Sequence, residues 1–571
     1  MIVSMPPLTL LFSMLLPFVA ALLCFALNRI VATRLLALLA SSALALAGIL
    51  LMVVQPLPAT FVDTLWLSQN IEPVHLVLQL DQARRLIVLL VLGGGALAML
   101  TLGYAIPAEL RRFGTIPGAL LFLIMAVVLG LLNRAALLQP LLWMSATLAT
   151  AAALRVSGPD TATDAPLITL LSGAVAAVLL LGCELLLSFN PQPSTAVLVL
   201  GLLAAMLSMG LPPLHAATHT NADAPSVVAS MLTALGLPVL GAFFLIRLLS
   251  IGLTPAWTIA ISLLGLLAMA TCAMAAFASQ NAGKLLIWQH GAQQGMIMLV
   301  AAQGGLALSM IAPSLILVAS LSTLAGGLAL AAIERTTGTA HMTELRLSGA
   351  QIPPALTLLV SSAAAAGMPG TWGFWGRVWF LNELPATMSW LVGPFLAASM
   401  LLLASTLSPV ASILRRQPLP RAVQSLSQSA ALPAFAVALP LIAFGIAPHL
   451  AIRELLNTPL AQQVAPNLLV MLAMLLAIIA LIGGAFLIAY SHSRTGQPIP
   501  IDQDSGPLPT ALAESLRVFT WLARPSAALN LIWAILLMLS QTLVGWLRRI
   551  EDRYYIASLM VALIIVILVF I

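Results

Sequence analysis

Charged side chains are scarce in this sequence. Only 7% of its 571 residues are Asp, Glu, Lys or Arg, whereas 61% are hydrophobic, and the mean hydropathy is +1.10. A soluble domain needs a charged surface, so this balance excludes an ordinary water-soluble protein. The sequence therefore predicts an integral membrane protein whose solvent is the lipid bilayer.

Cysteine is also rare, and its positions give no sign of redox or metal chemistry. Cys24, Cys183 and Cys272 all lie inside apolar runs, without the spacing of a metal site. No glycine-rich phosphate loop and no His-Glu-x-x-His pattern is present. We therefore expect no cofactor, no metal and no catalytic site in the chain itself. The net charge of +6 comes from scattered single residues, which argues against nucleic-acid binding.

Apolar runs long enough to cross a bilayer follow one another almost from end to end. A spanning helix needs roughly 20 mainly apolar residues, and the pattern predicts an all-α polytopic protein with about sixteen such helices. The first run has no basic residue before it, so we interpret it as a retained span and not as a signal peptide. The predicted spans are residues 8–27, 35–54, 86–104, 117–133, 136–154, 166–189, 195–211, 226–246, 256–278, 285–302, 306–333, 353–369, 387–410, 431–447, 467–490 and 555–571.

The basic residues favour one orientation. With the N-terminus outside, 17 of the 23 basic residues fall in cytoplasmic loops, and only six lie on the other face. The positive-inside rule describes this bias, so we expect a multi-pass protein of the cell inner (plasma) membrane. The six outer residues are Arg84, Arg85, Arg134, Arg247, Arg377 and Arg453.

A further apolar stretch, 527–546, is long enough to span. Spanning would move Arg548, Arg549 and Arg553 outside, so we expect a lateral helix along the cytoplasmic surface before the final span. A seventeenth span is the alternative.

Ionisable groups inside a bilayer are costly and usually functional. Only Glu184 and His290 lie clearly within the predicted spans, while His215, Arg247 and Arg377 lie near helix ends or breaks. Glu184 is five residues from the outer end of its span. Two interpretations stay open for this carboxyl group: a proton relay, or a side chain that is paired locally or reaches the interface.

His290 belongs to a polar cluster with Gln289, Gln293 and Gln294, most of which shares one side of a helix. Such a stripe must face protein or water. It could line a hydrated proton path, because histidine titrates near neutral pH. It could equally provide hydrogen bonds between helices.

Three prolines predict helix breaks at membrane depth. Pro212 and Pro213 interrupt the seventh span, and Pro238 falls inside the eighth. Broken spans are common at the ion sites of transporters. A simple kink is the alternative, because proline is frequent in membrane helices.

The order of several short patterns resembles the antiporter-like membrane subunits of respiratory complex I (NADH-quinone oxidoreductase), of Mrp antiporters and of membrane-bound hydrogenases. The resemblance covers roughly residues 75–410. The residues that carry it are Asp81; Pro213, Leu214 and His215; Ala224, Pro225 and Ser226; Arg247; Asn281 to Gly295 with Lys284; and Gly367, Pro369, Gly373, Phe374 and Arg377.

The resemblance implies a proton-translocating subunit with two inverted five-helix repeats, each containing a broken helix. Its expected partners are the lipid bilayer and other membrane subunits of a redox, ion-translocating or carbon-uptake complex. The implied division is residues 1–115 for spans 1 to 3, 116–250 for the first repeat, 251–430 for the second repeat, and 431–571 for the C-terminal spans, the lateral helix and the last span.

The departures from the family pattern concern its charged residues. Met144 follows Trp143 where the family has a glutamate, and Ser208 and Val239 stand where it has lysines. The predicted spans 306–333 and 387–410 contain no ionisable group. Apolar residues can replace a buried ion pair without harm to packing, so we expect the fold to survive and proton conduction to suffer.

Three hypotheses follow for function. The first is a largely structural membrane-arm subunit with a degenerate proton path, for example within an NADH-quinone oxidoreductase-like translocase. The second is proton translocation by a rerouted path, and the third is an unrelated secondary transporter. The candidate path residues are Glu184, His215, Arg247, His290, Gln293 and Gln294.

Overall fold

The computed structural model describes residues 6–450, apart from 56, 69–70, 106–113, 137, 159–163, 190–193, 280, 339, 341–351 and 407–430, together with 538 and 541–542. The predicted span 467–490 and the last span 555–571 lie outside the described residues. The same holds for nearly all of the predicted lateral helix 527–546.

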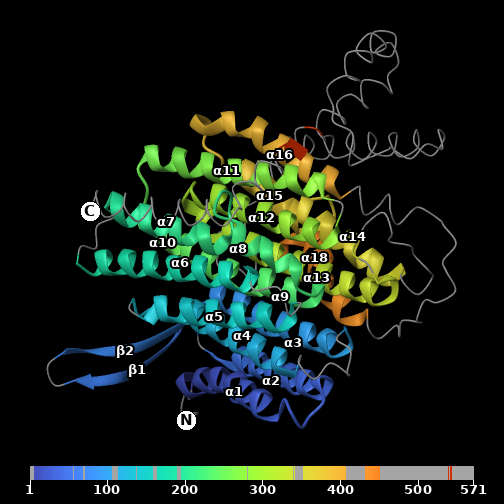
Figure 1. Ribbon diagram of the computed structural model, residues 1–571. Helices are drawn as coiled ribbons and strands as arrows, with labels where there is room; N and C mark the ends of the chain where they lie inside the picture. The colour runs from blue at the N-terminus through green and yellow to red at the C-terminus, as the bar shows by residue number, and fades with distance from the viewer. Residues whose placement is uncertain are drawn as a thin grey trace.

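The described chain is a stack of long helices that run roughly side by side (Figure 1). The N-terminal helices form one edge of the stack, and α11 and α16 lie at the opposite edge. The first half consists of α1 (Pro6–Leu27), α2 (Thr33–Val53), β1 (Ala59–Ser68), β2 (Ile71–Leu80), α3 (Gln82–Ala105), α4 (Ile116–Leu132), α5 (Leu138–Ser157), α6 (Asp164–Phe189), α7 (Thr195–Met209), α8 (Ala216–His219), η2 (Thr220–Asp223), α9 (Ser226–Leu235) and α10 (Leu237–Leu249).

The second half continues the stack. Its elements are α11 (Pro255–Ala278), α12 (Ala282–Ala301), the π-helical turn η3 (Ala307–Ile311), α13 (Ala312–Thr337), α14 (Ile352–Ala366), α15 (Trp372–Glu383), η5 (Ala386–Leu391), α16 (Val392–Ser405) and α18 (Leu432–Ile446).

Within the described residues, eight helices are long and apolar enough to cross a membrane, and four shorter apolar helices accompany them. This confirms the predicted polytopic helical fold. The predicted span 353–369 was wrong in extent, because α14 ends at Ala366 and a separate helix, α15, begins at Trp372. The residues between them, from Gly367 to Thr371, contain two glycines with positive φ, which helix geometry does not accommodate.

A β-hairpin between α2 and α3 is an element that the sequence analysis did not anticipate. β1 and β2 pair antiparallel, with Ala59 opposite Leu80 and Val62 opposite Val77. The hairpin extends away from the helices (Figure 1). Its base is fixed to the bundle, because Leu78 forms a bridge with Asn133 and the N–H of Arg134 donates to Val77.

Two helix breaks share the pattern Gly-x-Pro. The first is Gly210-Leu211-Pro212, which lies between α7 and α8; the second is Gly367-Met368-Pro369, which lies between α14 and α15. Both glycines are left-handed, with φ of 66° and 78°, a conformation that favours glycine because it lacks a Cβ. Similar local chemistry therefore interrupts a membrane helix at two distant points of the chain.

The third predicted break lies between α9 and α10. Pro238 occupies the first turn of α10, where a missing N–H is tolerated, and Gly236 separates the two helices. The predicted span 226–246 is therefore two short helices in series.

Helix α13 is the central element of the bundle. Residues 310–333, which include most of α13, are all buried, and α13 packs against α3, α9, α12, α14 and α18. Small residues permit this crowding, since a Cβ at Gly327 would overlap the side chain of Ser230 on α9. Close helix contact through glycine is how membrane helices associate when lipid offers no hydrophobic driving force between them.

We predict that Gly327→Ala lowers the free energy of unfolding by about 1–3 kcal/mol, because α13 and α9 must move apart. Thermal unfolding in detergent, followed by tryptophan fluorescence, measures this loss. Gly93→Ala on α3 is the matched control, since a Cβ there meets nothing within 4 Å. Equal melting temperatures for the two variants would contradict the proposed contact.

Candidate functional site

The main polar cluster of the bundle lies between α12 and α13. The His290 ring is fully buried, with Nδ1 2.9 Å from the Thr323 hydroxyl and 3.4 Å from the Ala319 carbonyl oxygen. The amide nitrogen of Gln294 lies 2.9 Å from His290 Nε2. These contacts fit an imidazole that carries its proton on Nδ1 and accepts a hydrogen bond at Nε2.

Two more glutamines extend the cluster to neighbouring helices. Gln293 donates to Ser322 on α13, and Gln289 donates to Ser405 on α16, both at 3.1 Å. The Oε1 atoms of Gln289, Gln293 and Gln294 are buried and have no hydrogen-bond partner among the described residues. The cluster therefore joins three helices and keeps unused acceptors, which buried water commonly satisfies.

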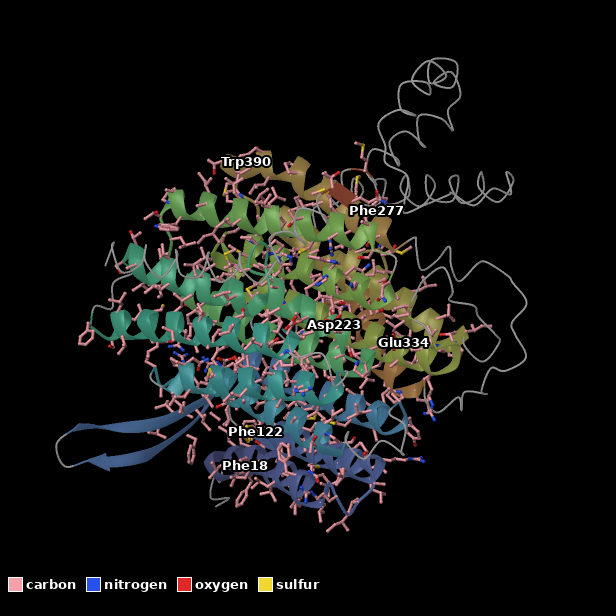
Figure 2. The ribbon with its side chains drawn as sticks, in the orientation of Figure 1. Phe18, Phe122, Asp223, Phe277, Glu334 and Trp390 are labelled. Carbon is pink, nitrogen blue, oxygen red and sulfur yellow. The ribbon has the colours of Figure 1, made fainter. Side chains whose placement is uncertain are left out.

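A cavity of about 90 Å³ lies beside this cluster, between α9, α12 and α13. Thr323 lines it at one place and Glu334, near the end of α13, at another. Glu334, labelled in Figure 2, accepts a 2.7 Å hydrogen bond from the Ser226 hydroxyl at the start of α9. A carboxylate at the N-terminal turn of a helix is favourable because it complements the helix dipole.

The second polar group is an ion pair between α6 and α10. Arg247 Nη2 lies 3.6 Å from Glu184 Oε1; the Arg247 side chain is 31% exposed and that of Glu184 only 3%. Glu184 therefore has a local partner. No ion pair or hydrogen bond recorded among the described residues connects this pair with the His290 cluster.

His215 lies in the break after α7 and contacts the second half of the molecule. Its ring centroid is 5.3 Å from that of Trp288 on α12, and the His219 ring is 5.0 Å from the same indole. The break in α7 is thus packed against the helix that carries His290.

Arg377 lies at the helix break between α14 and α15, where it binds backbone groups. Its buried guanidinium donates to the carbonyl oxygens of Gly373 at 3.0 Å and Ala365 at 2.9 Å. Ala365 lies in the last turn of α14, where the helix end leaves carbonyl groups without an intrahelical partner. The bond to Gly373 is made within α15, so the Arg377 side chain links the two helices across the break.

Met144, Ser208 and Val239, the three positions at which the sequence resemblance implies a charged residue, are uncharged. Ser208 is buried and donates to the Ala204 carbonyl of its own helix at 2.9 Å. Val239 is buried near the start of α10, and Met144 is half-buried beside Trp143 on α5. Ser208 also lines a cavity of about 20 Å³ with hydroxyl groups, those of Thr150, Thr169, Ser172 and Thr218.

No protein-family model and no curated protein matches this sequence, but solved structures do match its fold. A chain of the Mrp complex from Dietzia sp. DQ12-45-1b superposes with a TM-score of 0.69 and 17% identity, over 95% of this chain and 63% of that chain. The chain has the fold of the antiporter-like membrane subunits. Since it spans less than two thirds of that Mrp chain, the match concerns this shared part alone.

Two further structures carry the same antiporter-like fold. A chain of the membrane-bound sulfane sulfur reductase, an archaeal respiratory membrane complex, gives a TM-score of 0.69 at 16% identity, over 78% of this chain and 96% of that one. A chain of respiratory complex I from Thermus thermophilus gives 0.66 at 22%, over 80% and 98%. These superpositions establish the shared fold. At identities this low, function must be argued from the residues themselves.

Sequence reasoning missed several residues of the polar cluster. Glu334 lies one residue beyond the predicted span 306–333, so the sequence does not mark it as an intramembrane group. Ser322 and Thr323 give no signal in the sequence, because hydroxyl residues are common in apolar helices. A helical projection of residues 319–334 would have placed Ala319, Thr323 and Glu334 near one another around the helix.

We predict that Arg247→Leu lowers the free energy of unfolding by about 1–2 kcal/mol, because it leaves Glu184 buried without its partner; the exposure of Arg247 keeps the loss modest. Adding Glu184→Gln should restore most of that loss, giving a coupling energy in a double-mutant cycle. Chemical denaturation in detergent provides the measurement. Arg134→Leu, at an exposed arginine, is the control and should change stability little. Additive effects of the two substitutions would show that the pair is not coupled.

Proposed function

We propose that this chain is a membrane-arm subunit of a multisubunit redox or ion-translocating complex, in which its role is mainly structural. Its fold supports this proposal, since the three structures compared above are parts of membrane complexes: an Mrp complex, an archaeal respiratory membrane complex and respiratory complex I. The expected partners are other membrane subunits of such an assembly.

The observation that carries the proposal is the loss of charge at the positions of the family's proton path. Met144, Ser208 and Val239 stand where the resemblance implies a glutamate and two lysines. Ser208 cannot hold a proton as a lysine amine does, and its hydroxyl is bound to Ala204. A relay along the membrane needs a series of protonatable groups, and these substitutions interrupt it.

We include the domain division and the orientation in the proposal. Residues 116–250 and 251–430 would form the two inverted repeats, flanked by 1–115 and 431–571. The two Gly-x-Pro breaks, one in each segment, support this division. The uneven distribution of basic residues supports an outer N-terminus in the plasma membrane.

Proton translocation by a rerouted path is the second candidate function. The buried His290 cluster, with unused glutamine acceptors beside a cavity, favours it. Glu184 and Arg247 would have to connect to this cluster, with His215 as a further titratable group. The structural role is preferred, because the described contacts of Glu184 and of His290 are local: Glu184 pairs with Arg247 on α10, and His290 binds Gln294 within α12 and Thr323 on α13.

Proteoliposomes containing a pH-sensitive dye test the two candidates. We predict that the purified chain adds no proton uptake above that of protein-free liposomes when a membrane potential is imposed. The double variant Glu184→Gln with His290→Ala should then behave like the unmodified chain. Proton uptake by the chain that this double variant abolishes would overturn the structural proposal and establish the rerouted path.

Copurification tests the assembly itself. An affinity-tagged chain expressed in its own host should be isolated in mild detergent together with other membrane subunits, identified by mass spectrometry. Isolation only as a solitary monomer would contradict the proposed complex and would favour an unrelated transporter.

A further inference from the structure

The cavity of about 20 Å³ that Ser208 lines, here called the α7 cavity, lies at the break after α7. Its walls come from α5, α6 and α7, from α8 and η2, and from the ends of α9 and α10 that face each other. Its polar lining consists of Thr150, Thr169, Ser172, Ser208, Thr218 and Asn221. A space of this size holds about one particle as small as a water molecule, so the chemistry of these groups decides what occupies it.

Two hydroxyl groups of this lining use their hydrogens on the backbone. Thr150 donates to the Ala146 carbonyl oxygen at 2.8 Å, and Ser208 donates to the Ala204 carbonyl oxygen at 2.9 Å. A hydroxyl group has a single hydrogen and two lone pairs. The oxygens of Thr150 and Ser208 therefore have only lone pairs left for an occupant of the cavity.

Thr169 is in the same situation. Its hydroxyl oxygen lies 3.4 Å from that of Thr220, and Thr220 already donates its one hydrogen to the Ala217 carbonyl oxygen at 2.7 Å. The hydrogen between the two threonines must therefore come from Thr169. Its remaining lone pair is available to the cavity as an acceptor only.

Asn221 adds a fourth acceptor. Its side-chain nitrogen donates to the Thr233 hydroxyl at 3.1 Å. Its Oδ1 atom is buried and has no hydrogen-bond partner among the described residues, and the residue is only 4% exposed. A buried acceptor without a donor is costly, so an occupant that satisfies Oδ1 is favoured.

The break after α7 also leaves carbonyl oxygens without their usual donors. In a continuous helix the carbonyls of Ser208 and Met209 would accept from the residues four positions further on. Those residues are Pro212 and Pro213, which have no N–H. Since Ser208 lines the α7 cavity, this electronegative helix end lies beside it.

Two helix ends of the same polarity border the cavity. Leu207 and Ser208 belong to the last turn of α7, and Leu232 belongs to the last turn of α9. The C-terminal end of a helix carries partial negative charge and favours cations. The start of α10 borders the cavity too, but Pro238 contributes no N–H there. The helix ends thus add to the negative potential of the lone pairs.

The absence of fixed charge narrows the choice of occupant. None of the described residues that line the α7 cavity is ionisable. Ca²⁺ and Mg²⁺ are usually held by carboxylates, whereas oxygens at the C-terminal end of an interrupted membrane helix can coordinate monovalent cations. A water molecule has two hydrogens to donate and would leave some of the four acceptors unsatisfied, but a bare cation binds every oxygen that reaches it.

We propose that the α7 cavity binds one small alkali-metal cation, Na⁺ or Li⁺, through the side-chain oxygens of Thr150, Thr169, Ser208 and Asn221. Both bare ions are smaller than a water molecule, as the volume of the cavity requires. The ion joins α5, α6 and α7 to η2, so it stabilises the chain around the break. The site needs neither a transport path nor a partner subunit.

Equilibrium binding of radioactive Na⁺ tests the site directly. The purified full-length chain in detergent is captured on scintillation beads in choline chloride buffer, and unlabelled NaCl then replaces choline chloride at constant ionic strength. We expect saturable binding of one Na⁺ per chain, which LiCl displaces and choline chloride does not. A cavity that holds a bound water only gives no saturable binding, and this result overturns the proposal.

Two substitutions test the ligands. Thr150→Val and Ser208→Ala each remove one oxygen with little change of volume, and we expect each to weaken Na⁺ binding at least tenfold. Thr147→Val is the matched control and should bind Na⁺ like the unmodified chain. Thr147 is buried on the same helix as Thr150 and donates to the Trp143 carbonyl in the same way, but it does not line the α7 cavity.

Thermal unfolding provides a second readout and checks that the variants fold. An ion that binds only the folded chain raises the melting temperature by mass action. Exchange of choline chloride for NaCl should therefore raise the melting temperature of the unmodified chain and of Thr147→Val, and raise that of Thr150→Val and Ser208→Ala much less. If one of these two variants does not fold, the other decides the comparison.

The proposal is also overturned if Na⁺ binds the unmodified chain and all three variants equally, because the ion would then lie elsewhere. Both measurements use the isolated chain in detergent, without a proton gradient or a partner. Their outcome is therefore separate from that of the proton-uptake and copurification experiments: absence of Na⁺ binding leaves the structural role intact, and proton uptake leaves the α7 cavity to be judged by Na⁺ binding alone.

Discussion

The burial of α13 from Ala312 to Ile333 is the constraint on which the rest of the structure depends. A helix surrounded by other helices in a bilayer gains little from the hydrophobic effect, so it must be held by close packing and by hydrogen bonds between helices. Gly327 lets α9 approach, and Ser322 and Thr323 bind the polar residues of α12. Glu334 then binds Ser226, and Arg335 donates to the Tyr104 carbonyl at the end of α3. One helix thereby connects both halves of the chain.

The interrupted helices also depend on hydrogen bonds to neighbouring helices, because every broken turn in a membrane frees backbone groups that lipid cannot satisfy. Arg377 serves two carbonyl oxygens around the second break, and the indole of Trp375 on α15 donates to the Gly445 carbonyl of α18. Side chains of the protein thus replace the missing partners. Among the described residues, the hydrogen bonds of Arg377 all go to backbone oxygens, so its burial is explained by this structural role.

Most of the fold could be predicted from the sequence, because apolar runs of fixed length mark spans directly; the boundaries of α2, α6, α11 and α18 agree with the predicted ones to within a few residues. The hairpin was missed because it lies between spans, where membrane hydropathy carries no signal. The break after Ala366 was missed because Pro369 stood at the edge of the predicted span. The His290 cluster was visible as a polar stripe, but its partners on α13 depend on helix packing, which a single sequence does not specify.

Glutamine and hydroxyl groups explain how an antiporter-like fold is compatible with so few charges. A buried ion pair must recover the cost of removing two charges from water, whereas an amide bound to a hydroxyl costs much less to bury. The α12–α13 contact uses the latter kind of bond at Gln293 and Ser322, and His290 bonds to Thr323 beside it. Contacts of this kind hold helices together without fixed charge. Around Ser208 and Val239, buried apolar neighbours keep the packing of α7 and α10 without any charge at these two positions.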